Sequence, residues 1–196
     1  FNFFGNDRND FVQGAHAFNL PHAYLQVGRW TAGRTFSLFM DIDSFPDTLD
    51  FYGPNAAAFA INTQLRYARA LGHHLTLAGS IESPPAADGI ACTVFPQCSA
   101  RKRAPDLVTR LRWEDEIGHV QLSLAARHLS YGSGTGREDS TLAGGVNLSG
   151  SVRFSERRDY AVWGAFAGTG LQRYISGPSY LGTNDAVVLS DGTLQP

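Results

Sequence analysis

The sequence lacks long apolar runs: in its 196 residues, no stretch of 18 or more apolar residues occurs. A membrane-spanning helix is therefore not predicted, whereas a membrane β-barrel stays open, since barrel strands alternate in hydropathy. The sequence also lacks an excess of charge of one sign, because the formal net charge is −2. This balance favours neither nucleic acid nor a strongly acidic partner.

Motifs of catalysis and of cofactor binding are missing as well. The chain has no GxSxG, HExxH, GKS/GKT or paired CxxC pattern. The glycine-rich residues 132–136 lack the lysine and the following helix of a phosphate loop, and His73 and His74 fall in an expected short turn, where solvated side chains are the default. We therefore expect no enzymatic activity, no cofactor and no metal site.

Cysteine is scarce, and the two that occur, Cys92 and Cys98, lie in one loop-like stretch. Neither a histidine nor a further cysteine pair accompanies them at zinc-site spacing. A local disulfide bond in an exported protein is the favoured interpretation, and two unpaired thiols are the alternative.

What the sequence does contain is a period of two. Within residues 58–69, apolar Phe59, Ile61 and Leu65 alternate with polar Asn62 and Gln64, and residues 106–114 and 140–154 behave alike. Such alternation predicts β-strands with one apolar and one polar face. The predicted strands cover residues 16–27, 30–40, 58–69, 74–83, 106–114, 118–131, 140–154 and 159–174.

The connections between these strands alternate in length. Short turns are expected at residues 28–29, 70–73, 115–118 and 155–158, and long loops at residues 41–57, 84–105 and 132–139. Bacterial outer-membrane barrels have short turns on one rim and long loops on the other. The strands are also long enough to cross a bilayer, which takes about 9–11 residues each.

Arginines on the polar phase of the strands are not expected to face lipid, because an arginine at the lipid midplane costs about 2–4 kcal/mol. They face either a water-filled barrel interior or, on an ordinary two-layer sheet, bulk solvent, and composition alone does not separate the two. The loop at residues 41–57 is acidic, yet it also carries Phe45, Phe51, Tyr52 and Leu49, which a fully solvated loop has little reason to contain. If this loop folds into the lumen, its carboxylates face wall arginines and narrow a pore.

Four stretches of the chain resemble the DcaP-like family of bacterial outer-membrane porins. They are residues 21–28 (PHAYLQVG), 31–54 (TAGRTFSLFMDIDSFPDTLDFYGP), 64–67 (QLRY) and 168–175 (GTGLQRYI). The resemblance implies a homotrimer of large antiparallel barrels in the outer-membrane lipid. It also implies that the third extracellular loop folds inward as a constriction and that small anionic solutes such as dicarboxylates pass.

Carried over by position, Arg34 becomes a wall arginine of the constriction, residues 41–55 become the constricting loop, and Arg66 lies on the wall after it. In residues 30–40, however, Arg34 is in phase with Phe36 and Leu38. We therefore hypothesise that this strand is inverted, with its small residues facing a neighbouring subunit and its apolar residues packed beneath the loop. The chain is also too short for sixteen strands, and it begins at Phe1 without a signal-peptide pattern, so we expect a piece of a longer or processed protein.

The fold class expected is all-β, an antiparallel transmembrane β-barrel represented by about eight of sixteen strands. Residues 1–196 form one incomplete barrel segment, with residues 41–57 as the inward loop and 84–105 as an extracellular loop. The expected function is passive diffusion of small, hydrophilic, anionic solutes, with no nucleic acid as partner. The alternatives are a narrow, closed eight-stranded barrel with a structural or adhesive role and a secreted carbohydrate-binding β-sandwich. The candidate pore-lining and constriction residues are Arg34, Asp41, Asp43, Asp47, Asp50, Arg66, Arg110, Arg112 and Arg153, beside the cysteines Cys92 and Cys98.

Overall fold

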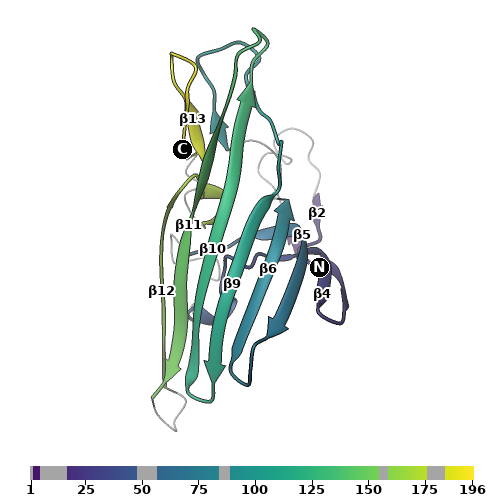
Figure 1. Cartoon of the computed structure of the whole chain (residues 1–196), viewed down its shortest axis with the longest axis vertical. Helices are drawn as coiled ribbons and strands as arrows, with labels where there is room; N and C mark the ends of the chain where they lie inside the picture. Colours follow the sequence, from purple (N-terminus) through teal and green to yellow (C-terminus); the bar gives the residue numbers. More distant parts are fainter. Residues whose placement is uncertain (1, 5–16, 48–56, 84–88, 155–158, 176–183) are drawn as a thin grey trace.

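The computed structural model describes residues 2–4, 17–47, 57–83, 89–154, 159–175 and 184–196. In these parts the chain is built of β-strands with two short 3₁₀ helices (Figure 1). The strands are β1 (Asn2–Phe4), β2 (Ala17–Asn19), β3 (Ala23–Val27), β4 (Trp30–Phe36), β5 (Ile61–Ala70), β6 (Leu75–Ser83), β7 (Ile90–Ala91), β8 (Ser99–Ala100), β9 (Asp106–Asp115), β10 (Gly118–Gly132), β11 (Glu138–Arg153), β12 (Tyr160–Thr169), β13 (Ala186–Val188) and β14 (Leu194–Gln195). The helices are η1 (Ile42–Ser44) and η2 (Gln172–Tyr174).

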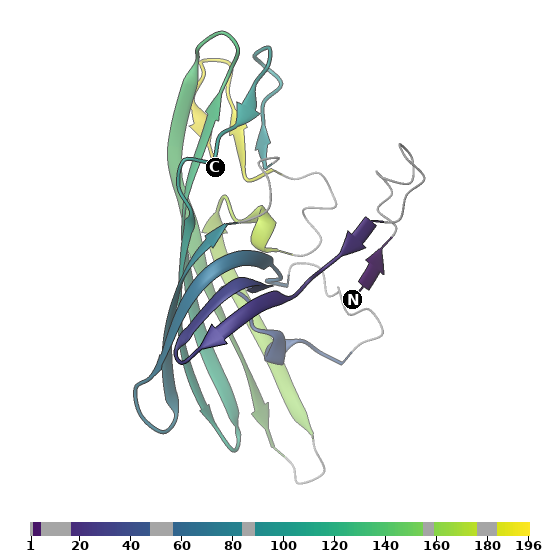
Figure 2. The same ribbon diagram turned by 90° about the vertical axis from the view of Figure 1, so that its right-hand side faces the viewer.

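One antiparallel sheet dominates the architecture. Its strands follow one another in the order β12-β11-β10-β9-β6-β5-β4-β3, with β8 added beside β10. The sheet is curved, and η1 and η2 both lie on its concave side (Figure 2). Among the described residues, the end strands β3 and β12 do not pair with each other, so the sheet is an open section of wall. An antiparallel wall of a partial barrel was predicted from the alternation, and this prediction is confirmed.

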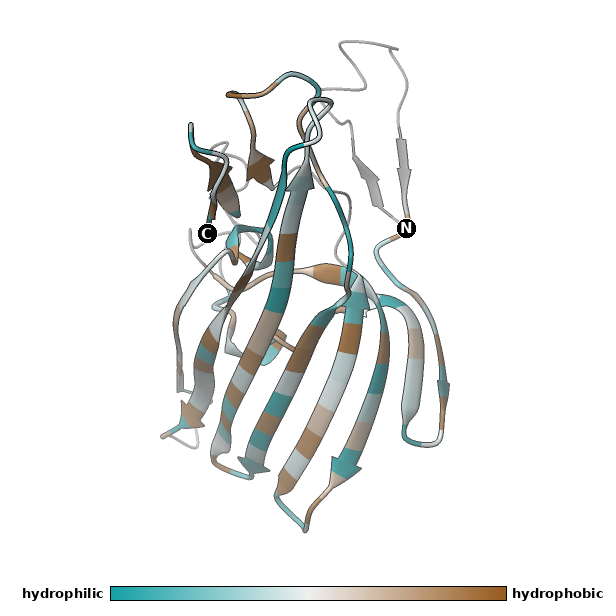
Figure 3. Ribbon diagram, turned by 45° about the horizontal axis from the view of Figure 1, so that its top comes forward, coloured by the Kyte–Doolittle hydropathy of each residue, from teal (hydrophilic) through white to brown (hydrophobic). Residues whose placement is uncertain are grey.

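The two faces of the sheet differ in polarity, which Figure 3 shows as alternating bands along the strands. The inner face is the concave one, where Gln121 and Ser123 are fully buried. The outer face carries apolar side chains that are open to the surroundings: Leu65 is 46% exposed and Leu124 is 50% exposed. A polar interior with an apolar exterior is the pattern of a barrel whose outside meets lipid.

The exposed apolar face and the strand pairing each exclude one of the two alternatives drawn from the sequence. A secreted β-sandwich buries the apolar face of its sheet against a second sheet, whereas Leu65 and Leu124 lie on an uncovered face here. A closed eight-stranded barrel needs its first and last strands to pair, and β3 and β12 do not.

Three of the predicted strands differ from the observed ones by four or more residues at one end or by being divided, and the others differ by at most three residues at an end. The strand predicted at residues 30–40 ends at Phe36, because the chain leaves the sheet there and turns onto its inner face. The strand predicted at residues 159–174 ends at Thr169 and is followed by η2. The described part of residues 16–27 is divided into β2 and β3.

The hairpin of β10 and β11 rises beyond the rest of the wall (Figure 1). Beside its upper part, β7, β13 and β14 form a small separate sheet. Leu129 and Tyr131 of β10 pack there against Val188 and Leu194. A disulfide joins Cys92 and Cys98, whose Cα atoms are 5.7 Å apart, at the edge of this cluster.

We expect the double substitution C92S/C98S to loosen only this upper layer. Cross-linking a short loop stabilises by about 2 kcal/mol through the entropy of the unfolded chain. Cleavage of the upper layer by an added protease should therefore speed up, while the temperature at which the large sheet unfolds stays that of the wild type. A lower unfolding temperature of the large sheet in this variant would contradict the assignment of the disulfide to the upper layer alone.

Gly118 begins β10 with a φ of +150°, and a Cβ atom placed there would overlap the carbonyl oxygen of Ser151. We expect G118A to disturb the β10–β11 pairing and to cost about 1–3 kcal/mol. The matched control is G72A, because Gly72 has a φ of +157° but nothing within 4 Å of the added atom. The temperature at which the folded form is lost on a denaturing gel should fall further for G118A than for G72A, and equal falls would contradict the steric argument.

Candidate functional site

The chain crosses the inner face of the sheet after β4, in residues 37–47, which we term the crossing segment. Side chains of β10 and β11 bind its backbone: Ser123 Oγ donates to the carbonyl of Leu38 (2.8 Å), and Asn147 Nδ2 donates to that of Phe39 (2.8 Å). Gln121 Nε2 donates to the carbonyl of Met40 (2.9 Å). Leu38, Phe39 and Met40 are themselves buried. The polar lumen wall therefore satisfies a backbone that has left the sheet.

Asp41 is the most heavily bonded residue of the crossing segment. Its Oδ2 accepts from His119 Nε2 (2.7 Å) and from Ser149 Oγ (2.8 Å), and its Oδ1 pairs with Arg112 Nη1 (3.3 Å). His119 Nδ1 lies 2.9 Å from Ser151 Oγ. Both partners are buried, with side-chain exposures of 1% for Asp41 and 4% for His119. A buried carboxylate with this many partners fixes the position of the backbone that carries it.

The remaining acidic residues of the crossing segment lie nearer to solvent. Asp43 pairs with Arg112 Nη2 at 2.8 Å, and its side chain is 57% exposed. Asp47 accepts from the hydroxyl of Tyr160 at 2.7 Å. Arg153 lines the same cavity as these two carboxylates, on the side of the segment that faces the short turns. Asp50, the fourth predicted carboxylate, lies outside the described residues.

Three arginines converge on the other side of the crossing segment. Arg66, Arg110 and Arg112 line one cavity there, together with Asp41 and Asp43. Arg66 donates to Gln64 Oε1 through Nε (3.1 Å), and its Nη2 donates to the carbonyl of Phe36. Within the described residues, no carboxylate lies within 4 Å of either Arg66 or Arg110, and Nε of Arg110 has no hydrogen-bond partner. This side of the segment therefore presents positive charge that the described protein leaves unpaired.

A second charged cluster, which the sequence analysis did not single out, lies above the first. Glu82 is fully buried and accepts from the backbone N–H of Leu38 (3.1 Å) and from Asn62 Nδ2 (2.9 Å). Tyr174 of η2 donates its hydroxyl to Asp106 Oδ2 (2.9 Å). Burial raises the pKa of Tyr174, and the neighbouring Glu82 and Asp106 carboxylates raise it further, so the hydroxyl stays protonated.

Arg127 extends this cluster toward the upper layer. Its Nε pairs with Asp106 (2.9 Å) and its Nη1 with Asp185 (2.9 Å), which also pairs with Arg173 (3.4 Å). The side chains of Arg127, Asp106 and Asp185 are all at most 5% exposed. The buried Arg127 between two carboxylates joins the segments of η2 and β13 to the wall.

The position of Arg34 differs from that of the converging arginines. In the pairing of β4 with β5, Thr35 lies opposite Asn62 and Gly33 opposite Gln64, which are inner-face residues. Arg34 and Phe36 therefore share the outer face, and the hypothesis of an inverted strand is wrong. Leu38 does turn inward as expected, but for another reason: the strand has already ended before it.

The inner-face residues that were not among the predicted site residues share a pattern that is visible in the sequence. His119, Gln121, Ser123 and Arg127 all fall on one phase of the predicted strand 118–131, and all are buried on the inner face. Asn147 falls on the polar phase of the predicted strand 140–154, and it binds the crossing segment through the carbonyl of Phe39. On a strand that crosses lipid, the polar residues of one phase are therefore the residues expected to face the lumen.

Within the residues that the structure describes, no group of three or more His, Cys, Asp or Glu side chains is placed to hold a metal ion. No described helix is long and apolar enough to span a membrane.

Comparisons with known proteins place the chain in a family. The model of the DcaP outer membrane protein family matches residues 2–194. The crystal structure of the outer membrane channel DcaP of Acinetobacter baumannii is similar in fold, with a TM-score of 0.68 and 21% sequence identity. The match covers 84% of this chain and 45% of that one, so the chain spans about half the length of that channel. No curated protein matches. The chain is therefore an outer-membrane protein and belongs to the DcaP outer membrane protein family.

Proposed function

We propose that this protein forms a porin through which small hydrophilic anions, including dicarboxylates, diffuse passively. The observation that carries the proposal is the pair Arg66 and Arg110 on the inner face, without a carboxylate within 4 Å among the described residues. A guanidinium group offers paired N–H donors that match a carboxylate. A solute with two carboxylates could meet both arginines at once as it passes the crossing segment.

The carboxylates beside these arginines support the proposal that the bound solute is also released. Asp41 and Asp43 line the cavity beside the arginines, and both pair with Arg112. These carboxylates offset part of the positive charge, so an anion is attracted without being held tightly. Conduction requires this balance of entry and exit.

We also propose a homotrimer, on the basis of the family resemblance. The described sheet is an open wall, and closing it requires further strands at both β3 and β12. In the porin that we propose, these strands come from the same protein rather than from the neighbouring subunits.

The test is single-channel current across a planar bilayer, with the purified full-length protein in asymmetric KCl. We expect ohmic conductance that closes in three equal steps, a reversal potential of anion-selective sign and a reduction of current by added dicarboxylate. A correctly folded protein without conductance would contradict the porin, and a cation-selective reversal potential would contradict the role of the arginines.

A further inference from the structure

The densest group of basic side chains away from the lumen lies at residues 101–103, Arg-Lys-Arg, between β8 and β9. The segment runs beside β10, where the N–H of Arg101 donates to the carbonyl of Ser130 (2.7 Å). The side chain of Arg101 lies across Gly132 and reaches Glu138, which is opposite Gly132 in the β10–β11 pairing. Gly132 and Glu138 are in phase with Leu142 and therefore share the outer face.

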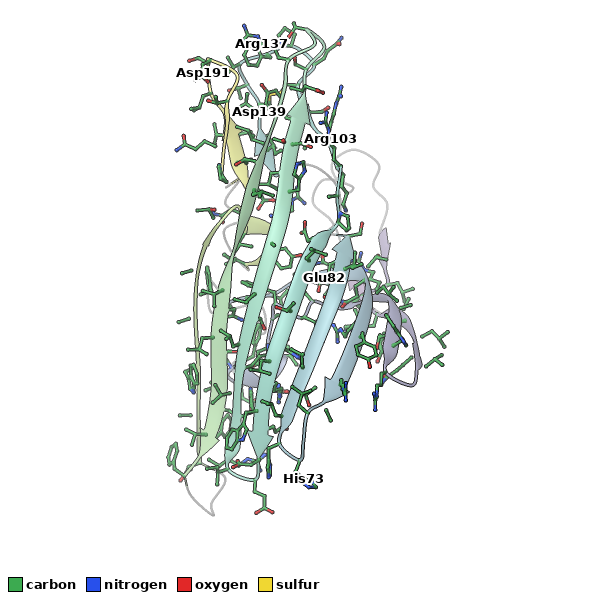
Figure 4. The ribbon with its side chains drawn as sticks, viewed as in Figure 1. His73, Glu82, Arg103, Arg137, Asp139 and Asp191 are labelled. Carbon is green, nitrogen blue, oxygen red and sulfur yellow. A yellow bond between two sulfur atoms is a disulfide. The ribbon has the colours of Figure 1, made fainter. Side chains whose placement is uncertain are left out.

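The group stands at the upper limit of the apolar outer band. Leu142 is 79% exposed and Leu107 is 54% exposed, and both lie on the outer face just below it. Lys102 Nζ donates to the hydroxyl of Ser83 (2.7 Å), one strand position beyond the inward-facing Glu82. Figure 4 shows Arg103 above the level of Glu82, while His73 marks the opposite end with the short turns. In an outer-membrane barrel the long loops face outward, so this level is that of the outer-leaflet headgroups.

Among the described residues, two arginines at this level share one carboxylate. Arg101 and Arg103 both pair with the single carboxylate of Glu138, at 3.4 and 2.6 Å. Their side chains are 52% and 47% exposed. Exposed ion pairs of this kind are weak and can be exchanged for a stronger partner. Two guanidinium groups around one carboxylate leave positive charge available to an anion.

We propose that Arg101 and Arg103 bind the phosphate groups of an outer-leaflet lipid, the lipid A portion of lipopolysaccharide. Arginine matches phosphate oxygens with two parallel N–H donors. The position selects a lipid over a dissolved phosphate, because acyl chains can cover Leu107 and Leu142 while the headgroup meets the cations. Basic clusters next to a membrane-embedded surface bind anionic headgroups with about 1 kcal/mol per residue.

The experiment measures the binding of diphosphorylated lipid A to the full-length protein in detergent, by native mass spectrometry and by the shift in melting temperature. R101Q/R103Q should weaken binding about 25-fold, since each lost arginine removes about fivefold. The matched control is R29Q/R69Q, because Arg69 lies opposite Leu77 on the outer face at the other rim and Arg29 in the adjacent turn. This control should bind lipid A as the wild type does.

Three outcomes are decisive. E138Q frees both arginines and should bind lipid A at least as tightly as the wild type, an effect that a folding defect does not produce. Dephosphorylated lipid A should bind wild type and R101Q/R103Q equally, and inorganic phosphate alone should not shift the melting temperature. Equal affinity of R101Q/R103Q and R29Q/R69Q for lipid A, weaker binding by E138Q, or a full shift with inorganic phosphate would each overturn the proposal.

Discussion

In R66Q/R110Q, the reversal potential in asymmetric KCl is expected to move from the anion-selective to the cation-selective sign. The substitution removes two of the three guanidinium groups from the cavity beside the crossing segment and leaves two carboxylates, Asp41 and Asp43, with the one arginine Arg112. A charge near a protein surface acts on a passing ion with about 1–4 kcal/mol at 4 Å. Removal of two charges should therefore change the ratio of anion to cation permeability by roughly 30-fold or more.

The matched control for this variant is R34Q. Arg34 lies on the neighbouring strand, but the β4–β5 pairing places it on the outer face. The R34Q variant loses the same kind of charge from the outer face of the wall, and we expect its reversal potential to equal that of the wild type. An unchanged potential in R66Q/R110Q, or a shift in R34Q as large as in the double variant, would refute an arginine filter at Arg66 and Arg110.

The prediction from sequence succeeded where one physical rule was enough. On a strand that crosses lipid, alternate side chains meet either hydrocarbon or water. The apolar Leu65 therefore lies on the outer face and the polar Gln64 on the inner face, as their residue types predict. The same rule would have assigned His119 and Gln121 to the lumen. The alternation rule also placed Arg34 on the apolar phase, opposite in facing to the other arginines, which is correct. The hypothesis of an inverted strand departed from the rule because the family resemblance implied that Arg34 lines the pore.

The end of β4 at Phe36 could not be predicted in this way. Residues 37–40 (SLFM) contain neither proline nor glycine and continue the strand pattern. What removes them from the sheet is tertiary: the carbonyl of Leu38 is bound by Ser123, 85 residues further along the chain. Local propensity carries no information about a partner at that distance.

The second large effect is expected for D41N, which should raise single-channel conductance and current noise. The substitution removes the carboxylate that His119 and Arg112 share, and it leaves the buried His119 without its anionic partner beneath the crossing segment. Breaking a buried pair by removing one partner costs about 3–5 kcal/mol. The segment would then leave its place on the inner face for part of the time, and the pore would widen.

Asp43 supplies the matched control, because it also pairs with Arg112 but is 57% exposed. Exposed pairs contribute about 0–1 kcal/mol, so D43N should leave conductance close to that of the wild type. A double-mutant cycle of D41N with H119L separates loss of the Asp41–His119 interaction from general destabilisation of the fold. If the two residues act as one bond, the second substitution adds little to the effect of the first on conductance. Additive effects of D41N and H119L, or equal conductance in D41N and D43N, would show that the crossing segment is held elsewhere. In that case the carbonyl contacts of Ser123, Gln121 and Asn147, rather than the buried carboxylate, would set the width of the pore.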